Sequence, residues 1–390
     1  MRTLFRFLVF IIILEFSSLV VVKTFNTYFQ HGKTSDFKFT ETQKQKIIQF
    51  LDDGLHYRCF DSLLGWVNKP RANVSLESGK RNINVNINSD GFRSSRRYEK
   101  KKDANVTRIL TLGDSFTFGS EVDDSECWSS ILECKDSNFE VLNAGVPGFG
   151  LDQSLLYFKR LNEDWNPDVV IVSYMTMLWL RHLNTFQPFR SKRSIPLSKP
   201  RFLLENGKLN LLDNYLNSPQ KYESFLEKPN AFLKQLGRND YFYSSEFGSS
   251  SPEYGNFVKL LYLLMGDQTK EKAELYTNGY YNQEHEGYSL TIAILDEFVN
   301  AIRKINAKPI ILFFPTKQDI NRMQQIKDPS YRVYQPLYME LSAMDVQCFD
   351  LAEDFYDLDT SILFENKGHY SPYGNEIIAN KLFDIINQIK

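Results

Sequence analysis

The chain has 390 residues, 42% of them hydrophobic and 24% charged, which is enough for one large globular domain or two smaller ones. A formal net charge of −2, with no basic stripe interleaved with aromatic residues, argues against nucleic acid as a partner. The four cysteines form no Cys-x-x-Cys pair and no metal-ligand spacing with the five histidines, so we expect no metal or other cofactor and assign no disulfide.

The N-terminus resembles a membrane anchor. Arg2 and Arg6 precede apolar runs at residues 7–14 and 16–22, which together approach the length of a membrane span. No Ala-x-Ala-like cleavage site follows. We therefore expect residues 1–24 to be an uncleaved signal anchor, with the rest of the chain periplasmic or extracellular. The alternative is an amphipathic or buried first helix.

Residues 25–105 are expected to form a polar stalk and a small β-containing neck. Ile83, Val85 and Ile87 alternate with asparagines, which is the period-two pattern of a half-exposed strand. A basic linker at residues 94–103 follows and leads into the main domain, which we place at residues 106–390.

Apolar strand-length segments alternate with helical segments in this domain. We predict strands at residues 107–112, 140–144, 168–174, 309–314 and 346–351, and helices at about 128–134, 151–161, 290–305 and 372–389. Fully apolar strands separated by crossover helices predict a five-stranded parallel sheet covered on both faces, which is a three-layer α/β/α sandwich.

Residues 182–289 break this alternation and read as a long insertion after the third strand. Within it, residues 202–211 predict a hairpin with an Asn206-Gly207 turn, and residues 257–265 predict an apolar helix. Because ligands bind at the carboxyl edge of open α/β sheets, we expect one of these two segments to wall the site.

The strand at 107–112 leads directly into Gly113-Asp114-Ser115. A serine at a sharp strand-to-helix turn is how an α/β fold presents a nucleophilic hydroxyl, although a helix N-cap is the alternative. A serine nucleophile needs a base, and His369, in the loop before the last helix, lies at the same edge of the predicted sheet. His182 is the second candidate base.

An oxyanion needs N–H donors aimed at it, and Gly145, just after the second predicted strand, is a candidate alongside Ser115 itself. The alternative is that the Gly/Pro-rich segment 143–150 is only a connecting loop.

The segments around Ser115, Gly145 and His369 occur in this order along the chain. Together they resemble the SGNH (GDSL-like) hydrolase superfamily, over roughly residues 89–390. The resemblance implies a nucleophile at Ser115, an oxyanion glycine at Gly145 and a base at His369. Two departures stand out: Met177 occupies the usual place of an oxyanion asparagine, and Asn366 and Lys367 stand where an aspartate normally precedes the histidine. Asn366 and Glu365 are the candidate supports for the base, and Thr176 and Asn184 are candidate replacement donors.

The resemblance implies a serine esterase or O-acyltransferase, resembling membrane-anchored bacterial proteins that act on ester-bearing small molecules or on envelope or exported glycans. The alternative is a catalytically degenerate domain that binds a glycan or a partner protein. The acyl group, the acceptor and the oligomeric state are not specified by the sequence.

Overall fold

The computed structural model describes residues 40–79, 81–191, 195–243 and 275–389. Within these residues no helix has both the length and the hydropathy needed to cross a membrane. The predicted anchor at residues 1–24 and the predicted helix at 257–265 lie outside the described residues, so both stay predictions.

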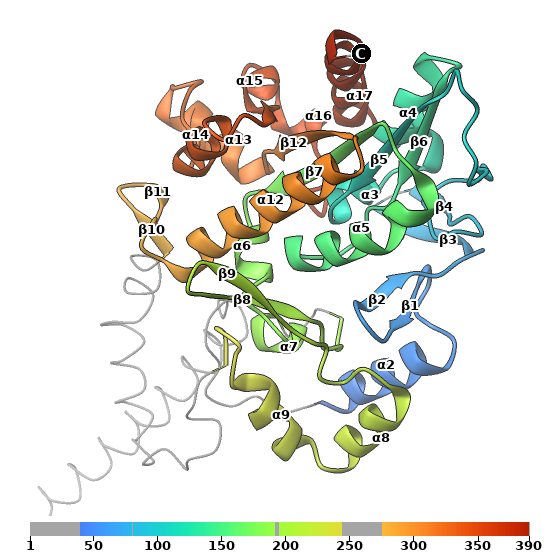
Figure 1. Cartoon of the computed structure of the whole chain (residues 1–390), viewed down its shortest axis with the longest axis vertical. Coiled ribbons are helices and arrows are strands. Elements are labelled where there is room, and N and C mark those ends of the chain that lie inside the picture. The colour runs from blue at the N-terminus through green and yellow to red at the C-terminus, as the bar shows by residue number, and fades with distance from the viewer. Residues whose placement is uncertain (1–39, 80, 192–194, 244–274, 390) are drawn as a thin grey trace, which may run out of the picture.

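A five-stranded parallel sheet lies in the upper part of the molecule as drawn in Figure 1, in the order β13-β12-β7-β5-β6. Its strands are β5 (Thr107–Leu112), β6 (Phe139–Asn143), β7 (Val169–Met175), β12 (Lys308–Phe314) and β13 (Gln347–Asp350). The ends of each strand match the predicted ones to within a residue. The predicted sheet is therefore confirmed, because uninterrupted apolar runs of this length are typical of strands buried on both faces.

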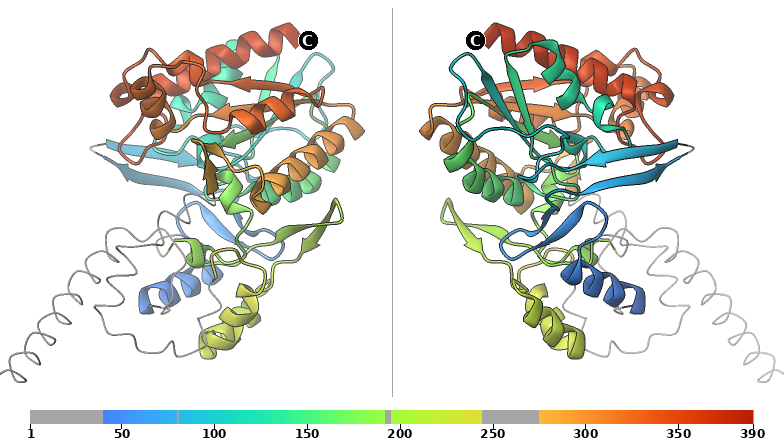
Figure 2. Two further views of the ribbon diagram at one scale, coloured as in Figure 1. Left: turned by 90° about the vertical axis from the view of Figure 1, so that its left-hand side faces the viewer. Right: turned by 90° about the vertical axis from the view of Figure 1, so that its right-hand side faces the viewer.

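Helices cover both faces of this sheet (Figure 2). α4 and α17 pack together on one face, and α5 and α12 pack together on the other, which confirms the three-layer sandwich. The helices of the sandwich are α3 (Ser115–Phe118), α4 (Trp128–Lys135), α5 (Leu151–Trp165), α12 (Glu286–Lys304), α13 (Lys317–Ile326), α14 (Gln335–Ser342), α15 (Ala352–Phe355), α16 (Thr360–Leu363) and α17 (Pro372–Ile389), with a 3-10 turn η1 at Asp124–Glu126.

α12 begins four residues earlier than predicted. His285 is the residue before its first turn, and its Nδ1 accepts a hydrogen bond of 3.0 Å from the Gly287 N–H. A side-chain cap of this kind satisfies one of the N–H groups that a helix start leaves unpaired. His285 therefore has a structural role at the helix start.

The neck contains α2 (Glu41–Asp52) and two antiparallel hairpins, and the segment after β7 contains several short elements. The hairpins are β1 (Arg58–Asp61) with β2 (Gly65–Asn68), and β3 (Asn73–Ser78) with β4 (Arg81–Asn86). After β7 come α6 (Leu178–Arg181), α7 (Gln187–Arg190), β8 (Arg201–Glu205), β9 (Lys208–Leu212), α8 (Pro219–Glu227), α9 (Pro229–Gly237), β10 (Tyr276–Thr277) and β11 (Tyr280–Tyr281).

The predicted hairpin is confirmed as β8 and β9. Its turn residues Asn206 and Gly207 have φ values of 51° and 73°. A two-residue hairpin loop of this type needs positive φ at both positions, which Asn and Gly adopt most readily.

The first part of the neck, α2 with β1 and β2, packs against the insertion, below the sandwich in Figure 2. The rings of Phe60 and Tyr222 lie 5.8 Å apart, and Asn214 Nδ2 donates a hydrogen bond of 3.0 Å to the Ser62 carbonyl. A Cβ atom on Gly65 would lie 2.3 Å from the Ser198 carbonyl oxygen, so only glycine permits this approach. Two segments far apart in the sequence thus form one layer.

Candidate active site

Ser115 is the first residue of α3 and follows β5 through a sharp turn. The Asp114 carboxylate caps this helix by accepting a 2.9 Å hydrogen bond from the Phe116 N–H, and Arg181 pairs with the same carboxylate at 2.7 Å. The cap is therefore Asp114, which leaves the Ser115 hydroxyl available for another partner. A Cβ on Gly113 would lie 2.2 Å from Thr117 Oγ1, so the turn can be this tight only with glycine there.

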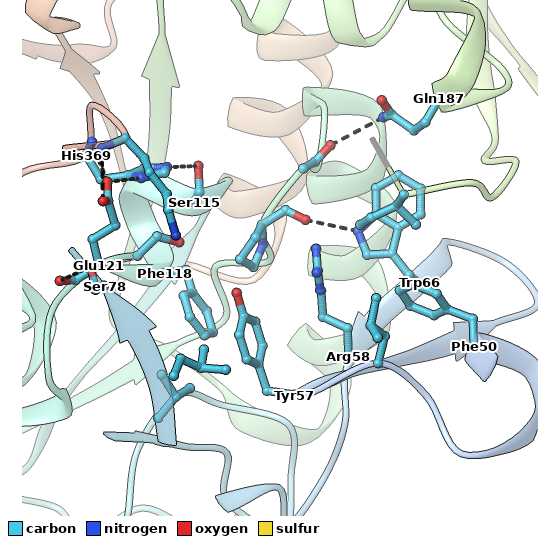
Figure 3. A pocket seen from close by; sticks show the side chains of 18 of the residues that line it. Phe50, Tyr57, Arg58, Trp66, Ser78, Ser115, Phe118, Glu121, Gln187 and His369 are labelled. Carbon is cyan, nitrogen blue, oxygen red and sulfur yellow. Dashed lines mark hydrogen bonds and ion pairs between the residues drawn. The ribbon is translucent and has the colours of Figure 1, made fainter. Parts of the chain in front are cut away.

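His369 reaches Ser115 from the other end of the chain. Its Nε2 lies 2.9 Å from Ser115 Oγ, so the structure brings the two predicted residues together (Figure 3). The histidine sits after a tight turn in which the Glu365 N–H donates to the His369 carbonyl at 2.7 Å and Gly368 has a φ of 92°. Only glycine adopts this backbone conformation without cost, so Gly368 fixes how the imidazole leaves the turn.

Glu121 orients the imidazole, and it was missing from the sequence-based site. Its Oε2 lies 2.8 Å from His369 Nδ1, and the carboxylate also accepts the Lys367 and His369 N–H groups at 3.0 Å and 3.2 Å (Figure 3). With Nδ1–H donating to a carboxylate, the Nε2 lone pair faces the serine hydroxyl. Ser115, His369 and Glu121 therefore form a catalytic-triad arrangement.

Several contacts make Glu121 a stable anion. Burial raises the pKa of its carboxyl, but the hydrogen bonds from the His369 side chain and from the two N–H groups outweigh burial and lower the pKa below its usual 4.5. Glu121 also has a φ of 73°, in a region that costs a non-glycine residue of order 1–3 kcal/mol. The surrounding structure must compensate that cost.

Buried Arg93 supplies part of this compensation. Its guanidinium donates to the carbonyl oxygens of Phe118 at 2.8 Å and Val122 at 2.6 Å, and it also bonds to that of Gly119. These carbonyls flank Glu121 on both sides. Arg93 thereby fixes the loop that carries the carboxylate.

The two predicted supports for the base do not hold the imidazole. The Glu121 carboxylate occupies Nδ1, while Glu365 meets His369 only through its backbone N–H. Asn366 is exposed on the turn, and the Cβ direction of Gly79 points to its amide. The carboxylate comes from the loop after the nucleophile, not from the residues before the histidine.

Gly145 does not offer a free N–H to an oxyanion. Its N–H donates a 3.0 Å hydrogen bond to Asn143 Oδ1, and its carbonyl accepts from Asn68 Nδ2 at 2.9 Å. A Cβ there would lie 2.4 Å from the Phe118 nitrogen. Glycine at this position thus lets the loop after β6 touch the backbone of α3, which is a packing role.

This packing role gives a prediction. Gly145→Ala should lower the free energy of unfolding by about 1–3 kcal/mol, because the new methyl group meets α3 backbone that cannot move aside cheaply. Denaturant unfolding measures the change. Gly207→Asn is the control, since its Cβ direction is open and asparagine accepts positive φ. Equal stability of the two variants would contradict the packing role.

Gly148, in the same loop, differs from Gly145 in its hydrogen bonding. It lies in the turn Val146–Phe149, closed by a 3.1 Å hydrogen bond from the Phe149 N–H to the Val146 carbonyl, and its φ of 92° follows Pro147 as a type II turn requires. Within the described residues, the N–H groups of Ser115 and Gly148 donate to no protein acceptor, and both residues line one pocket.

The other candidate donors are engaged elsewhere. Met177 is partly exposed and its N–H donates to Met175 Sδ, Thr176 Oγ1 donates to Asp319, and Asn184 Nδ2 donates to the Phe186 carbonyl and to Asp240. None of these three lines the pocket at Ser115. Of the candidate oxyanion donors, only the backbone N–H groups of Ser115 and Gly148 belong to residues that line this pocket and have no acceptor among the described residues.

His182, the second candidate base, is fully buried and apart from the site. Its Nε2 lies 3.0 Å from Thr291 Oγ1, and burial lowers its pKa to about 3. It is a neutral core residue.

A cavity of about 400 Å³ opens beside Ser115 and His369 (Figure 3). Aromatic side chains from the neck line it, together with the residues between α6 and β8. The named lining residues from these two segments include Phe50, Tyr57, Trp66, Gln187, Ile195 and Pro196.

The hairpin is not the predicted wall, because β8 and β9 do not line the cavity, whereas the beginning of the same insertion does. The alternative wall, residues 257–265, lies outside the described residues and stays a prediction. The neck, which we expected to be a stalk with a small β-structure, also lines the cavity.

No protein-family model matches this chain, and no curated protein matches it. Similar solved structures include a member of the lipolytic protein G-D-S-L family from Veillonella parvula, at 12% identity over 72% of this chain and 98% of that one, with a TM-score of 0.33. A psychrotrophic esterase from Pseudoalteromonas sp., inhibited by monoethylphosphonate, has 12% identity over 72% and 97%, with a TM-score of 0.35. The lipase/acylhydrolase from Enterococcus faecalis has 14% identity over 72% and 95%, with a TM-score of 0.34.

Proposed function

We propose that this protein is a serine ester hydrolase of the SGNH type, with Ser115 as nucleophile, His369 as general base and Glu121 as the carboxylate that orients the base. One observation carries the proposal, namely the unbroken pair of hydrogen bonds from Ser115 Oγ to His369 Nε2 (2.9 Å) and from His369 Nδ1 to Glu121 (2.8 Å). A serine hydroxyl at neutral pH needs such a base to become nucleophilic.

The acylation step follows from this geometry. Ser115 Oγ attacks the ester carbonyl carbon while His369 Nε2 takes the hydroxyl proton, and the resulting imidazolium is stabilised by the Glu121 carboxylate. The carbonyl oxygen becomes an oxyanion, which the N–H groups of Ser115 and Gly148 are proposed to bind. The ester C–O bond then breaks, and the leaving alkoxide takes the proton from Nε2.

Deacylation repeats this sequence with an acceptor in place of the alcohol. A water oxygen attacks the acyl carbon, His369 takes the water proton, and the bond to Ser115 Oγ breaks as that oxygen regains the proton. An alcohol in place of water would make the protein an O-acyltransferase. We propose hydrolysis first. As an extension, we propose that residues 1–24 anchor the protein in a membrane and that it transfers the acyl group to an envelope or exported glycan.

A fluorophosphonate probe tests the proposal directly, because it reacts only with a serine that its base activates. We expect the probe to label the wild-type protein at Ser115, as located by peptide mass spectrometry, and to leave Ser115→Ala unlabelled. Denatured wild-type protein is the control for nonspecific reaction. An unlabelled native protein would favour the alternative, a degenerate domain that binds its ligand without turnover.

A further inference from the structure

The cavity at Ser115 carries more positive than negative side chains. Its basic lining residues are Lys46, Arg58, Arg181, Arg190 and Lys367, and its acidic ones are Glu77 and Glu121. Glu121 is already engaged by His369, and Arg181 is paired with Asp114 at 2.7 Å. The basic side chains that line the cavity therefore outnumber the carboxylates with which the protein could neutralise them.

Arg58 has no anionic partner. Within the described residues its guanidinium makes no hydrogen bond or ion pair, its Nε is buried without a partner, and its Cζ lies 5.4 Å from the centre of the Tyr57 ring. The Tyr57 ring in turn stacks on Phe118, with centroids 4.8 Å apart. Since Phe118 ends the helix that Ser115 begins, these stacked side chains connect that helix to Arg58, which lines the same cavity as Ser115 (Figure 3).

Arg190 resembles Arg58 in this respect. It ends α7, its Nε is buried without a partner, and it forms no ion pair among the described residues. Burial and the neighbouring charge of Arg181 lower the pKa of Arg190 to about 10, so the group remains a cation at neutral pH. Asp240, the nearest opposing charge, accepts hydrogen bonds from Thr185 and Asn184 instead.

Two unpaired guanidinium groups in one wall are costly unless a ligand pairs with them. A partly buried cation without a counter-ion loses hydration and gains nothing in return. A guanidinium offers five N–H donors in a planar fork that matches the oxygens of a carboxylate or a phosphate. The chemistry that complements these residues is therefore an oxyanion.

We propose that the substrate is an ester that also carries a carboxylate or phosphate group, and that this oxyanion pairs with the free guanidinium groups of Arg58 and Arg190 while the ester carbonyl lies at Ser115. The claim that the ester reacts at Ser115 rests on the proposed function, whereas the claim that Arg58 and Arg190 bind an oxyanion does not. The rings of Phe50 and Trp66, in the same wall, are available to contact the apolar part of the substrate.

Three phenyl esters with a common acetyl group test the substrate class. Para-acetoxybenzoate carries a carboxylate, para-acetoxyphenyl phosphate carries a phosphate, and phenyl acetate carries neither. We expect kcat/KM to be at least ~10-fold higher for one charged ester than for phenyl acetate, because a charge-assisted hydrogen bond to a guanidinium stabilises the bound charged ester. The better of the two charged esters identifies the oxyanion. Equal values for all three esters would overturn the proposal.

Arg58→Gln and Arg190→Gln test the residues. Each should reduce the preference for the charged ester over phenyl acetate by about tenfold or more. Arg97→Gln is the matched control, because Arg97 is highly exposed and does not line the cavity, and it should keep the full preference. Fluorophosphonate labelling of each variant reports that the site is folded. Labelled variants that both keep the preference would overturn the assignment.

Calorimetry separates this proposal from the proposed function. In the Ser115→Ala background, which cannot turn over any ester through Ser115, benzoate or phenyl phosphate should bind and Arg58→Gln or Arg190→Gln should weaken binding by about tenfold or more. If the wild type hydrolyses no ester and takes no probe, that result still supports the anion site. Absence of binding by either anion would overturn it.

Discussion

Replacement of either reacting partner should abolish turnover. Ser115→Ala and His369→Ala are each expected to lower kcat on phenyl acetate by at least about 10³-fold, because the nucleophile and its base act as one unit. The double variant should be no slower than either single variant, since each change already removes the whole proton-transfer path. Initial rates measured spectrophotometrically decide this, with any residual rate compared with the uncatalysed reaction.

Ser137→Ala is the matched control for these variants. It removes an exposed hydroxyl that does not line the cavity, while the bonds between Ser115 and His369 stay intact. We expect its kcat to stay within about twofold of wild type, as for most substitutions outside the reacting groups. Turnover that survives in Ser115→Ala would place the nucleophile elsewhere.

Glu121→Gln should produce the second largest effect. We expect kcat to fall by about 10²- to 10⁴-fold with a smaller change in KM, because an amide facing Nδ1 no longer stabilises the imidazolium and favours the wrong tautomer. Glu365→Gln and Asn366→Ala are the controls, since neither side chain meets the imidazole in the structure. A larger loss in Glu365→Gln than in Glu121→Gln would contradict the structural assignment.

The pH dependence of the free energy of unfolding should also reveal the hydrogen bonds of Glu121. The pKa of Glu121 is lowered from 4.5 because hydrogen bonds from His369 and the backbone outweigh burial. The stabilisation from these bonds is present above about pH 4.5 and is lost as the pH falls through the lowered pKa of the folded state. Glu121→Gln should therefore remove the contribution of one titrating group to the loss of stability below about pH 4.5.

The sheet could be predicted from local sequence because its signal is local. Each buried parallel strand is a largely apolar run, and some of these runs are followed by a residue that favours turns, such as Gly113 after β5 and Pro315 after β12. The turn at Asn206-Gly207 could also be predicted, because Asn and Gly are the residues that most readily adopt two consecutive positive φ values. Once the parallel sheet was predicted, Ser115 and His369 could be paired, since this topology brings their loops to one edge of the sheet.

Glu121 could not be found this way. The chain has 48 acidic residues, and Glu121 lies in an acidic stretch that reads as a solvated loop. Its role depends on a left-handed backbone conformation and on bonds to residues almost 250 positions away, neither of which leaves a periodic pattern. The resemblance directed attention to the residues before His369, where this chain holds no carboxylate at the imidazole.

The contribution of the neck to the cavity could not be predicted for a related reason. Its position depends on long-range packing, such as the contact of Phe60 with Tyr222, and not on local pattern. Gly145 differs, because its N–H is used by a neighbour only two residues away, Asn143.

The cavity walls have a consequence for how this protein can diverge. Ser115, Glu121 and His369 come from the sandwich, whereas Phe50, Arg58 and Trp66 come from the neck, so the proposed reacting groups and part of the cavity lining are encoded in separate stretches of the gene. Substitutions at these three neck positions can change the shape and charge of the cavity without altering the reacting groups. Exchange of the whole neck would have to retain Arg93, because its guanidinium fixes the loop that carries Glu121.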